Sequence, residues 1–281
     1  MDTTTTLVRA PVGDVLRTWR EKRRLSQLGL AARADISARH LSFLETGRSA
    51  PSREMVLRLA EQLEMPLRER NELLLSAGYA PMYSHIPLDA PQMSAVRNAI
   101  SQVVAGHDPY PAMAVDRQWN LAASNQAFSL FTESVAPHLL EPPINVLRLT
   151  LHPDGLAPRL LNHGEWRGYL LHRLRQRISR TDEPRLTRLY DELAAYPCND
   201  RTPDFASLDA GAGIVLPMRL RVGDVALSML STVSFFGTPL DVTVSELLVK
   251  SFFPMDEQTT SFLISRRAKA GAADENQPIE M

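Results

Sequence analysis

The stretch of sequence that decides the fold runs from Ser26 to Arg48 and reads SQLGLAARADISARHLSFLETGR. Its apolar residues recur at helical spacing in two short runs, which the segment 35–37 separates. Ser26 and Ser37 stand where a hydroxyl can accept a hydrogen bond from the first turn of each helix. Gly47 closes the second run, because glycine readily adopts the left-handed conformation that ends helices. The stretch therefore predicts two short helices joined by a tight turn.

The same spacing divides this stretch into an inner and an outer face. The inner face takes the apolar residues Leu30, Ala31, Leu41 and Leu44, and the small Ala31 lets the two helices approach closely. We expect Glu45 to pair with an arginine of the first helix of the domain, which precedes this stretch. The outer face, near the start of the second helix, is left to Ser37, Ala38, Arg39, His40 and Ser42.

On both sides of this stretch, helical patterns fill residues 12–78. Ser52 is a further expected helix cap after Pro51, and Pro66 separates the last two helices. About five short helices are therefore predicted within a first domain of residues 10–78. The segment 79–92 contains three prolines and is interpreted as a linker.

A second domain is expected over residues 93–265, followed by a polar tail at 266–281. An amphipathic helix with Met93, Val96, Ile100 and Val103 on one face would open it. Strands are predicted at 111–115, 118–122, 213–221, 225–236 and 246–253, and helices at 124–133 and 165–195. Gly223 suits a hairpin turn between two of these strands. The fold class is thus an all-α domain followed by an α+β domain with an antiparallel sheet.

Composition limits the possible functions. The chain has 281 residues, 44% of them hydrophobic, and a net charge of −1. Residues 9–48 nevertheless carry nine Arg and Lys against four acids, which favours a polyanionic partner at that end. Cys198 is the only cysteine, so no internal disulfide can form. Neither a secretory signal nor a long apolar run is evident, and we expect a cytoplasmic protein without a membrane partner.

Several of these residues occur in a known order. Ser26-Gln27, Leu30-Ala31, Leu44-Glu45, Gly47-Arg48 and Pro51-Ser52 follow the pattern of XRE/Cro-type helix-turn-helix repressors, which the segment resembles over about 65 residues. The resemblance implies that the second helix enters the major groove of a DNA operator, in a homodimer that binds a pseudo-palindrome.

The resemblance also implies a role for each residue of the interface. Gln27 would anchor the motif against a DNA phosphate. Arg39 is the best candidate to bind guanine O6 and N7 together, and Ser37, Ala38, His40 and Ser42 lie beside it. Arg48, with one of Arg20, Arg23 or Arg24, would neutralise phosphates.

The second domain carries a looser resemblance. The pieces Asp116-Arg-Gln-Trp, Ser124-Asn-Gln-Ala-Phe, Asn145-Val-Leu-Arg-Leu and Glu246-Leu-Leu-Val-Lys-Ser-Phe-Phe-Pro are similar to the ligand-binding domain of MmyB-like regulators, which has a PAS-like fold. The family's pattern is altered around 197–204. The resemblance implies a non-covalent apolar effector such as a fatty acid. The residues that would line its pocket are Trp119, Phe128, Phe131, Trp166, Met229, Phe235 and Phe236, although a plain core would use the same residues.

Other functions stay open at this point. The C-terminal domain can instead serve only to dimerise or to bind a protein partner, and a third possibility is an enzyme fused to a DNA-binding module. His163-Gly-Glu165 followed by Pro197-Cys198 suggests a zinc deaminase, but position 201 is Arg and no second cysteine exists. His152, His163 and His172 are irregularly spaced for a metal site. We therefore expect neither catalysis nor a metal.

Overall fold

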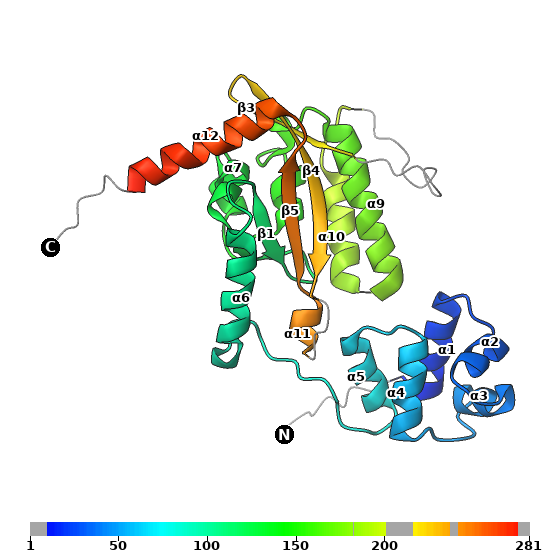
Figure 1. Cartoon of the computed structure of the whole chain (residues 1–281). Coiled ribbons are helices and arrows are strands. Elements are labelled where there is room, and N and C mark those ends of the chain that lie inside the picture. Colours follow the sequence, from blue (N-terminus) through cyan, green and yellow to red (C-terminus); the bar gives the residue numbers. More distant parts are fainter. Residues whose placement is uncertain (1–9, 182, 201–215, 237–240, 275–281) are drawn as a thin grey trace, which may run out of the picture. The chain divides into compact units, whose positions relative to one another are not determined.

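The computed structural model describes residues 10–181, 183–200, 216–236 and 241–274 (Figure 1). The described chain forms two compact units. One comprises residues 10–87 together with 241–245, and the other comprises residues 88–236 together with 246–274. The boundary at Pro87 falls inside the predicted linker, whereas the return of 241–245 to the first unit has no counterpart in the sequence pattern.

The first unit contains the five predicted helices. They are α1 (Val12–Lys22), α2 (Gln27–Arg33), α3 (Ala38–Glu45), α4 (Arg53–Gln62) and α5 (Leu67–Ser76). The predicted serine caps are confirmed, because the hydroxyls of Ser26, Ser37 and Ser52 each accept a hydrogen bond from the backbone N–H three residues later. These caps satisfy donors that a helix leaves without partners.

Apolar burial holds these helices together. Leu30, Ala31, Leu41 and Leu44 are essentially inaccessible to solvent, as predicted, and they pack with residues of α1, α4 and α5. Gly13 allows a close approach of α1 to α3, since a Cβ at this position would lie 2.6 Å from the carbonyl oxygens of Leu44 and Glu45. The pair α2–α3 is thus fixed against α1.

The linker after α5 is tied down on two sides. The buried amide of Asn71 in α5 donates to the carbonyl of Tyr83 (2.7 Å) and accepts from the backbone N–H of Met82 and Tyr83. On the other side lies α11 (Val242–Ser245), preceded by Asp241, whose carboxylate accepts from the Ser84 hydroxyl at 2.6 Å. Residues 79–87 of the predicted linker are therefore an ordered part of the first unit, and residues 88–92 belong to the second.

The second unit is built on an antiparallel sheet of order β2-β1-β5-β4-β3. The strands are β1 (Ala112–Val115), β2 (Leu121–Ser124), β3 (Met218–Val222), β4 (Val225–Phe235) and β5 (Leu248–Pro254). The predicted α+β class is confirmed, and Gly223 forms the β3–β4 turn with a positive φ of 57°. β2 begins later than predicted because residues 116–120 form a turn. The predicted strand positions 213–215 lie outside the described residues.

Helices cover both faces of this sheet (Figure 1). On one face, α6 (Ser94–Ala105) packs through Ile100 and Val104 against Ala112, Ala114 and Val249. The prediction that Val103 belongs to this buried face was wrong, since its side chain is 51% exposed and Val104, one turn after Ile100, is buried instead. The opposite face of the sheet holds the main core, with α9 (His163–Thr181) and α10 (Pro184–Ala195).

Shorter elements complete the unit. The predicted helix 124–133 is a 3-10 turn η2 (Gln126–Phe128) continued by α7 (Ser129–Thr132). The predicted helix 165–195 is the pair α9 and α10. The remaining elements are η1 (Pro91–Met93), η3 (Pro137–Leu139), α8 (Val146–Leu151), η4 (Ala157–Arg159) and α12 (Glu257–Asp274).

Candidate functional site

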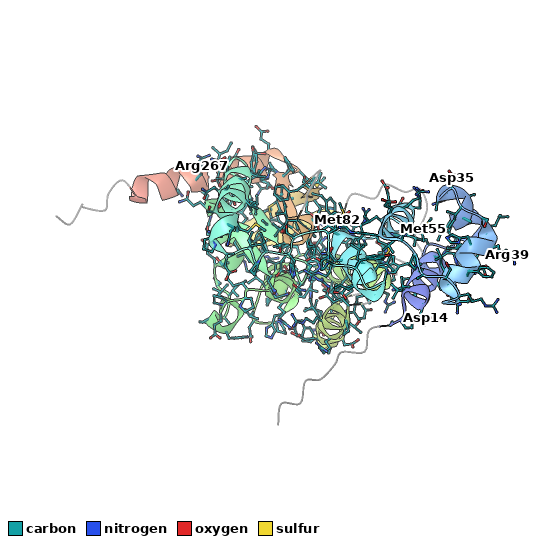
Figure 2. All side chains as sticks on the ribbon, turned by 90° about the horizontal axis from the view of Figure 1, so that it is seen from below. Asp14, Asp35, Arg39, Met55, Met82 and Arg267 are labelled. Atoms are coloured by element: carbon teal, nitrogen blue, oxygen red, sulfur yellow. The ribbon has the colours of Figure 1, made fainter. Side chains whose placement is uncertain are left out.

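An exposed cationic surface lies along α3, from Arg39 in its first turn to Arg48 just beyond its last. Ser37 caps the helix through the backbone N–H of His40 (3.1 Å), and Arg39 follows on the outer side. The guanidinium groups of Arg39 and Arg48 lie 5.3 and 5.9 Å from the ring centre of Phe43, which supports both of them. Figure 2 shows Arg39 at the outer edge of the first unit. Both arginines are exposed and can reach a partner.

The other predicted residues lie around this surface. Ala38, His40 and Ser42 are half-buried on α3, and the carbonyl of Ser42 accepts from the Thr46 hydroxyl at 2.7 Å. Gln27 begins α2 as predicted, and its side-chain amide donates to Glu45 Oε2 at 2.8 Å. This bond uses one of the two amide hydrogens of Gln27 and fixes where the side chain points.

A buried ion pair sets the angle between α1 and α3. Glu45 is confirmed as the partner of an arginine of α1, since Arg20 Nε and Nη2 donate to its two carboxylate oxygens at 2.6 and 3.0 Å. Burial favours a raised pKa for Glu45, but the hydrogen bonds from Arg20 and Gln27 and the charges of Arg20 and Arg17 outweigh it and lower the pKa. The carboxylate is therefore structural and holds the motif together.

This pairing decides between the three arginines proposed as phosphate contacts. Arg20 is buried against Glu45 and cannot reach a phosphate. Arg23 donates to the carbonyl oxygens of Leu63 and Glu64 at 2.7 and 2.8 Å. Arg24 is exposed, in the left-handed conformation that ends α1. Arg24 is thus the one of the three that is exposed, whereas Arg23 is half-buried and bound to two carbonyl oxygens.

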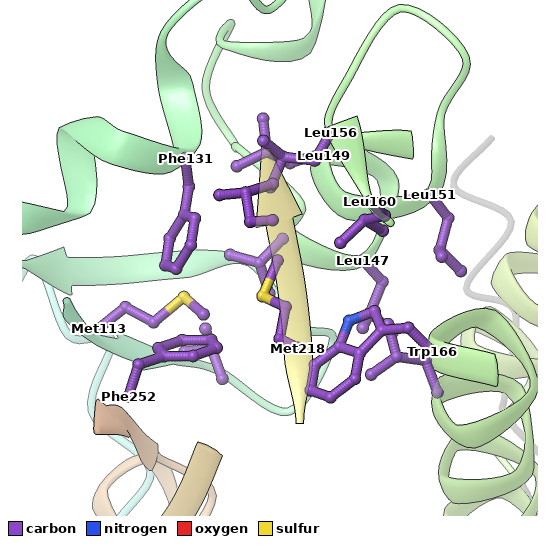
Figure 3. Packing of buried hydrophobic residues seen from close by; sticks show 14 of the residues in the cluster. Met113, Phe131, Leu147, Leu149, Leu151, Leu156, Leu160, Trp166, Met218 and Phe252 are labelled. Atoms are coloured by element: carbon purple, nitrogen blue, oxygen red, sulfur yellow. The ribbon is translucent and has the colours of Figure 1, made fainter. Parts of the chain in front are cut away.

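The main core of the second unit contains a small cavity of about 20 Å³. This is room for little more than one water molecule, which needs about 10–15 Å³. Figure 3 shows Met113, Phe131 and Phe252 at one side of this core and Trp166 with Leu147 at the other. The cavity walls include the aromatic residues Trp119, Phe128, Phe131, Trp166 and Phe252, together with Met113, Met218 and Lys250.

Four of the seven residues predicted to line a pocket do line this cavity: Trp119, Phe128, Phe131 and Trp166. The other three need correction. Met229 is buried in the same core but is not part of the cavity wall. Phe235 is 69% exposed, because the long strand β4 extends beyond the core, and Phe236 packs with the smaller cluster on the α6 side.

Sequence reasoning missed Lys250, which lies at the centre of the sheet. Side chains alternate along β5, so Lys250 faces the same core as Leu248 and Phe252, and it is buried. Its ammonium lies 5.3 Å from the ring centre of Trp166 and 5.4 Å from that of Phe252. Among the described residues, no hydrogen bond or ion pair holds it. Burial, with a smaller effect of Arg173, lowers the pKa of Lys250 to about 8.

Trp119 is the second unpaired donor of this cavity. The carboxylate of Asp116 accepts from the backbone N–H of Gln118 and Asn120, both at 2.8 Å, and so closes a turn around Trp119. Trp119 adopts a positive φ of 67°, uncommon for a residue with a side chain. Its indole N–H is buried and has no partner in the described part of the chain.

The histidines do not gather into one metal site. His152 lies near His138 and Asp154, with donor atoms within 4.8 Å of one another, whereas His163 and His172 belong to α9. The backbone N–H of Asp154 already donates to His152 Nδ1 at 3.0 Å.

No helix in the described ranges has the length and apolar character needed to cross a membrane.

The two units together define a DNA-binding transcription regulator with a separate ligand-binding domain. Comparison with known families agrees: residues 11–73 match the helix-turn-helix domain, and residues 96–264 match the MmyB-like transcription regulator ligand binding domain. The chain therefore belongs to the MmyB-like transcription regulators. The match over the second unit names a transcription regulator, and neither description names an enzyme. No curated protein matches the chain significantly.

Proposed function

We propose that this chain is a sequence-specific transcriptional regulator that acts in the cytoplasm, is not an enzyme, and responds to a small apolar, fatty-acyl-like ligand. The observation that carries the DNA-binding part is the outer face of α3. Ion pairing fixes α1 and α3 from within through Glu45, while Arg39 and Arg48 stay exposed. A rigid helix with an accessible arginine in its first turn, and a second one just beyond its last turn, is suited to reading the major groove.

The proposal gives a role to each residue on α3 and in the turns around it. Arg39 reads a base through its guanidinium, assisted by His40 and Ser42. Arg48 and Arg24 neutralise phosphates and place the helix without reading sequence. Gln27 keeps one amide hydrogen for a phosphate, and Ser37 and Ala38 bring the first turn of α3 close to the DNA.

A single copy of α3 reads few base pairs, so we further propose that the regulator binds as a homodimer. Two copies would place their α3 helices about 34 Å apart on a pseudo-palindromic operator. This predicts a steep dependence of affinity on salt, because each neutralised phosphate releases counterions.

Ligand response is assigned to the aromatic cavity of the second unit. At about 20 Å³ the cavity is too small for an acyl chain, so its walls must separate on binding. Met113 and Met218 can adapt to this, since methionine side chains are flexible. β5 lines the cavity and follows directly on residues 241–245, which belong to the first unit. A shift of β5 would therefore be passed along the backbone to the first unit.

Native mass spectrometry of the purified chain, with and without an operator fragment, tests the proposal. We expect a dimer that retains a small molecule and binds one operator. A dimer that retains nothing, and that binds no DNA selectively, would instead favour an adaptor whose C-terminal domain only dimerises or binds a protein. Turnover of a bound ligand would contradict the non-enzymatic assignment.

A further inference from the structure

The strongest unexplained feature of the molecule is a buried cation without a counterion. Lys250 is on the central strand of the sheet, between β1 and β4, with its side chain in the main core. Burying an unpaired ammonium is costly, and cores retain such groups rarely. Contacts with the faces of Trp166 and Phe252 offset part of that cost, but they supply no acceptor.

A second donor lines the same cavity. The indole N–H of Trp119 is buried without an acceptor, and the turn closed by Asp116 holds it there in a left-handed conformation. Lys250 and Trp119, each with a donor that has no partner among the described residues, thus line one cavity, whose other lining residues are aliphatic or aromatic apart from Thr150. A cavity of this volume holds about one water molecule, which can accept from one or two donors but cannot neutralise the ammonium.

We infer that the cavity binds the acidic head group of its ligand, with Lys250 and Trp119 as the anchor. This inference rests on the proposed ligand response and adds the head-group chemistry and the orientation. A carboxylate accepts from both donors and neutralises Lys250, so the ligand enters head first. Its alkyl chain then lies among Phe128, Phe131 and Met113, where the walls must open.

The anchor predicts a strict order of head groups. A carboxylate gains a charge-assisted hydrogen bond, an amide of the same shape gains only neutral ones, and an amine meets a second cation. The specificity of the site would therefore come from Lys250, and the apolar walls would contribute affinity for chain length.

The test uses the delipidated full-length chain and three probes of equal chain length: octanoate, octanamide and octylamine. Calorimetric titration at pH 7 should give octanoate an affinity about 10- to 100-fold above that of octanamide, with octylamine not bound. Lys250→Met should remove that preference and change octanamide binding less than threefold. Trp119→Phe, which keeps the ring but removes the N–H, should weaken octanoate about fivefold.

Lys269→Met is the matched control, because Lys269 is an exposed lysine on α12. Equal binding of octanoate and octanamide would overturn the anchor while leaving an apolar ligand site in place. Loss of octanoate binding in Lys269→Met but not in Lys250→Met would overturn the anchor and place the site in the surface groove that Phe262, Arg266 and Lys269 of α12 line. If none of the probes binds the wild type, the fatty-acyl ligand itself is contradicted, and the anchor with it.

Discussion

Each unit of this protein buries a charged side chain, and the two units treat that charge differently. In the first unit Glu45 is fully buried and receives hydrogen bonds from Arg20 and Gln27. In the second unit Lys250 is buried and receives no partner among the described residues. The pKa of Glu45 is lowered, which favours its charged form, whereas the pKa of Lys250 is lowered to about 8, which disfavours its charged form.

The partnered charge of Glu45 therefore has a structural role, and the unpartnered charge of Lys250 has a functional one. Glu45 is buried with all its partners in place, so it fixes α3 against α1 and has no acceptor left for a ligand. A buried charge without a partner is unfavourable until something binds, and such groups mark functional sites. The DNA-binding surface is therefore built beside a satisfied charge, and the ligand cavity around an unsatisfied one.

The largest effect is expected from Glu45→Ala. It would leave the buried guanidinium of Arg20 without its carboxylate, and removing one partner of a buried pair costs about 3–5 kcal/mol. Chemical unfolding should show this loss in the first unit. Arg17→Ala, which removes an ion-pair partner that is 44% exposed, should change stability by less than about 1 kcal/mol. Similar effects of both variants would contradict the structural role of the pair.

Lys250→Met should act in the opposite direction. Below pH 8 the native and unfolded chains both carry the ammonium, and its burial destabilises the native state. Between about 8 and the ordinary value of 10.5 the unfolded state binds more protons, so the stability of the wild type rises with pH. The variant should be about 3 kcal/mol more stable at pH 7, and this advantage should shrink by pH 10. A difference that does not vary with pH would indicate that Lys250 is neutral or hydrated.

Arg39→Ala tests the outer face of α3. We expect specific DNA affinity to fall by about 1–3 kcal/mol and selectivity to relax at one base position. Arg48→Ala should instead weaken specific and random DNA alike. Binding titrations on both kinds of DNA distinguish them, and an equal loss on both for Arg39→Ala would make Arg39 a phosphate contact.

The smallest effect concerns the ordered linker. Asp241→Ala removes the acceptor of the Ser84 hydroxyl and of the Ile86 backbone N–H, and we expect a local loss of about 1 kcal/mol. Hydrogen exchange of residues 82–86 should quicken about fivefold, while Asp224→Ala in the exposed β3–β4 turn leaves it unchanged. Unchanged exchange in Asp241→Ala would show that other contacts, such as those of Asn71 and Thr243, hold the linker without the Asp241 carboxylate.

Local signals made the first unit predictable from its sequence. Serine caps, Gly47 and the helical spacing act within a few residues, so the five helices and the inward side chains were predicted correctly. The pairing of Glu45 was also predicted, because a carboxylate on the inner face beside a basic helix needs a partner. The prediction that Val103 is buried was wrong because Val104 is equally apolar, and only packing decides which of the two faces the sheet.

The ligand cavity depends on contacts between distant segments, and it was predicted only in part. Four of the suggested aromatic residues line the cavity, but Phe235 was assigned without knowing that β4 extends beyond the core. Lys250 was missed although a signal existed: it interrupts the apolar run 247–253, where alternation places it on the inner face. That β5 is the central strand could not be deduced, because strand pairing is not local.

The most direct test of the central claim is a selection of genomic DNA fragments by the wild type and Arg39→Ala in parallel, at near-physiological salt. We expect the wild type to enrich one pseudo-palindromic sequence and Arg39→Ala to lose it. Absence of enrichment by the wild type, both alone and with octanoate, would contradict a role in sequence-specific regulation and would leave the helix-turn-helix as a surface for protein contact.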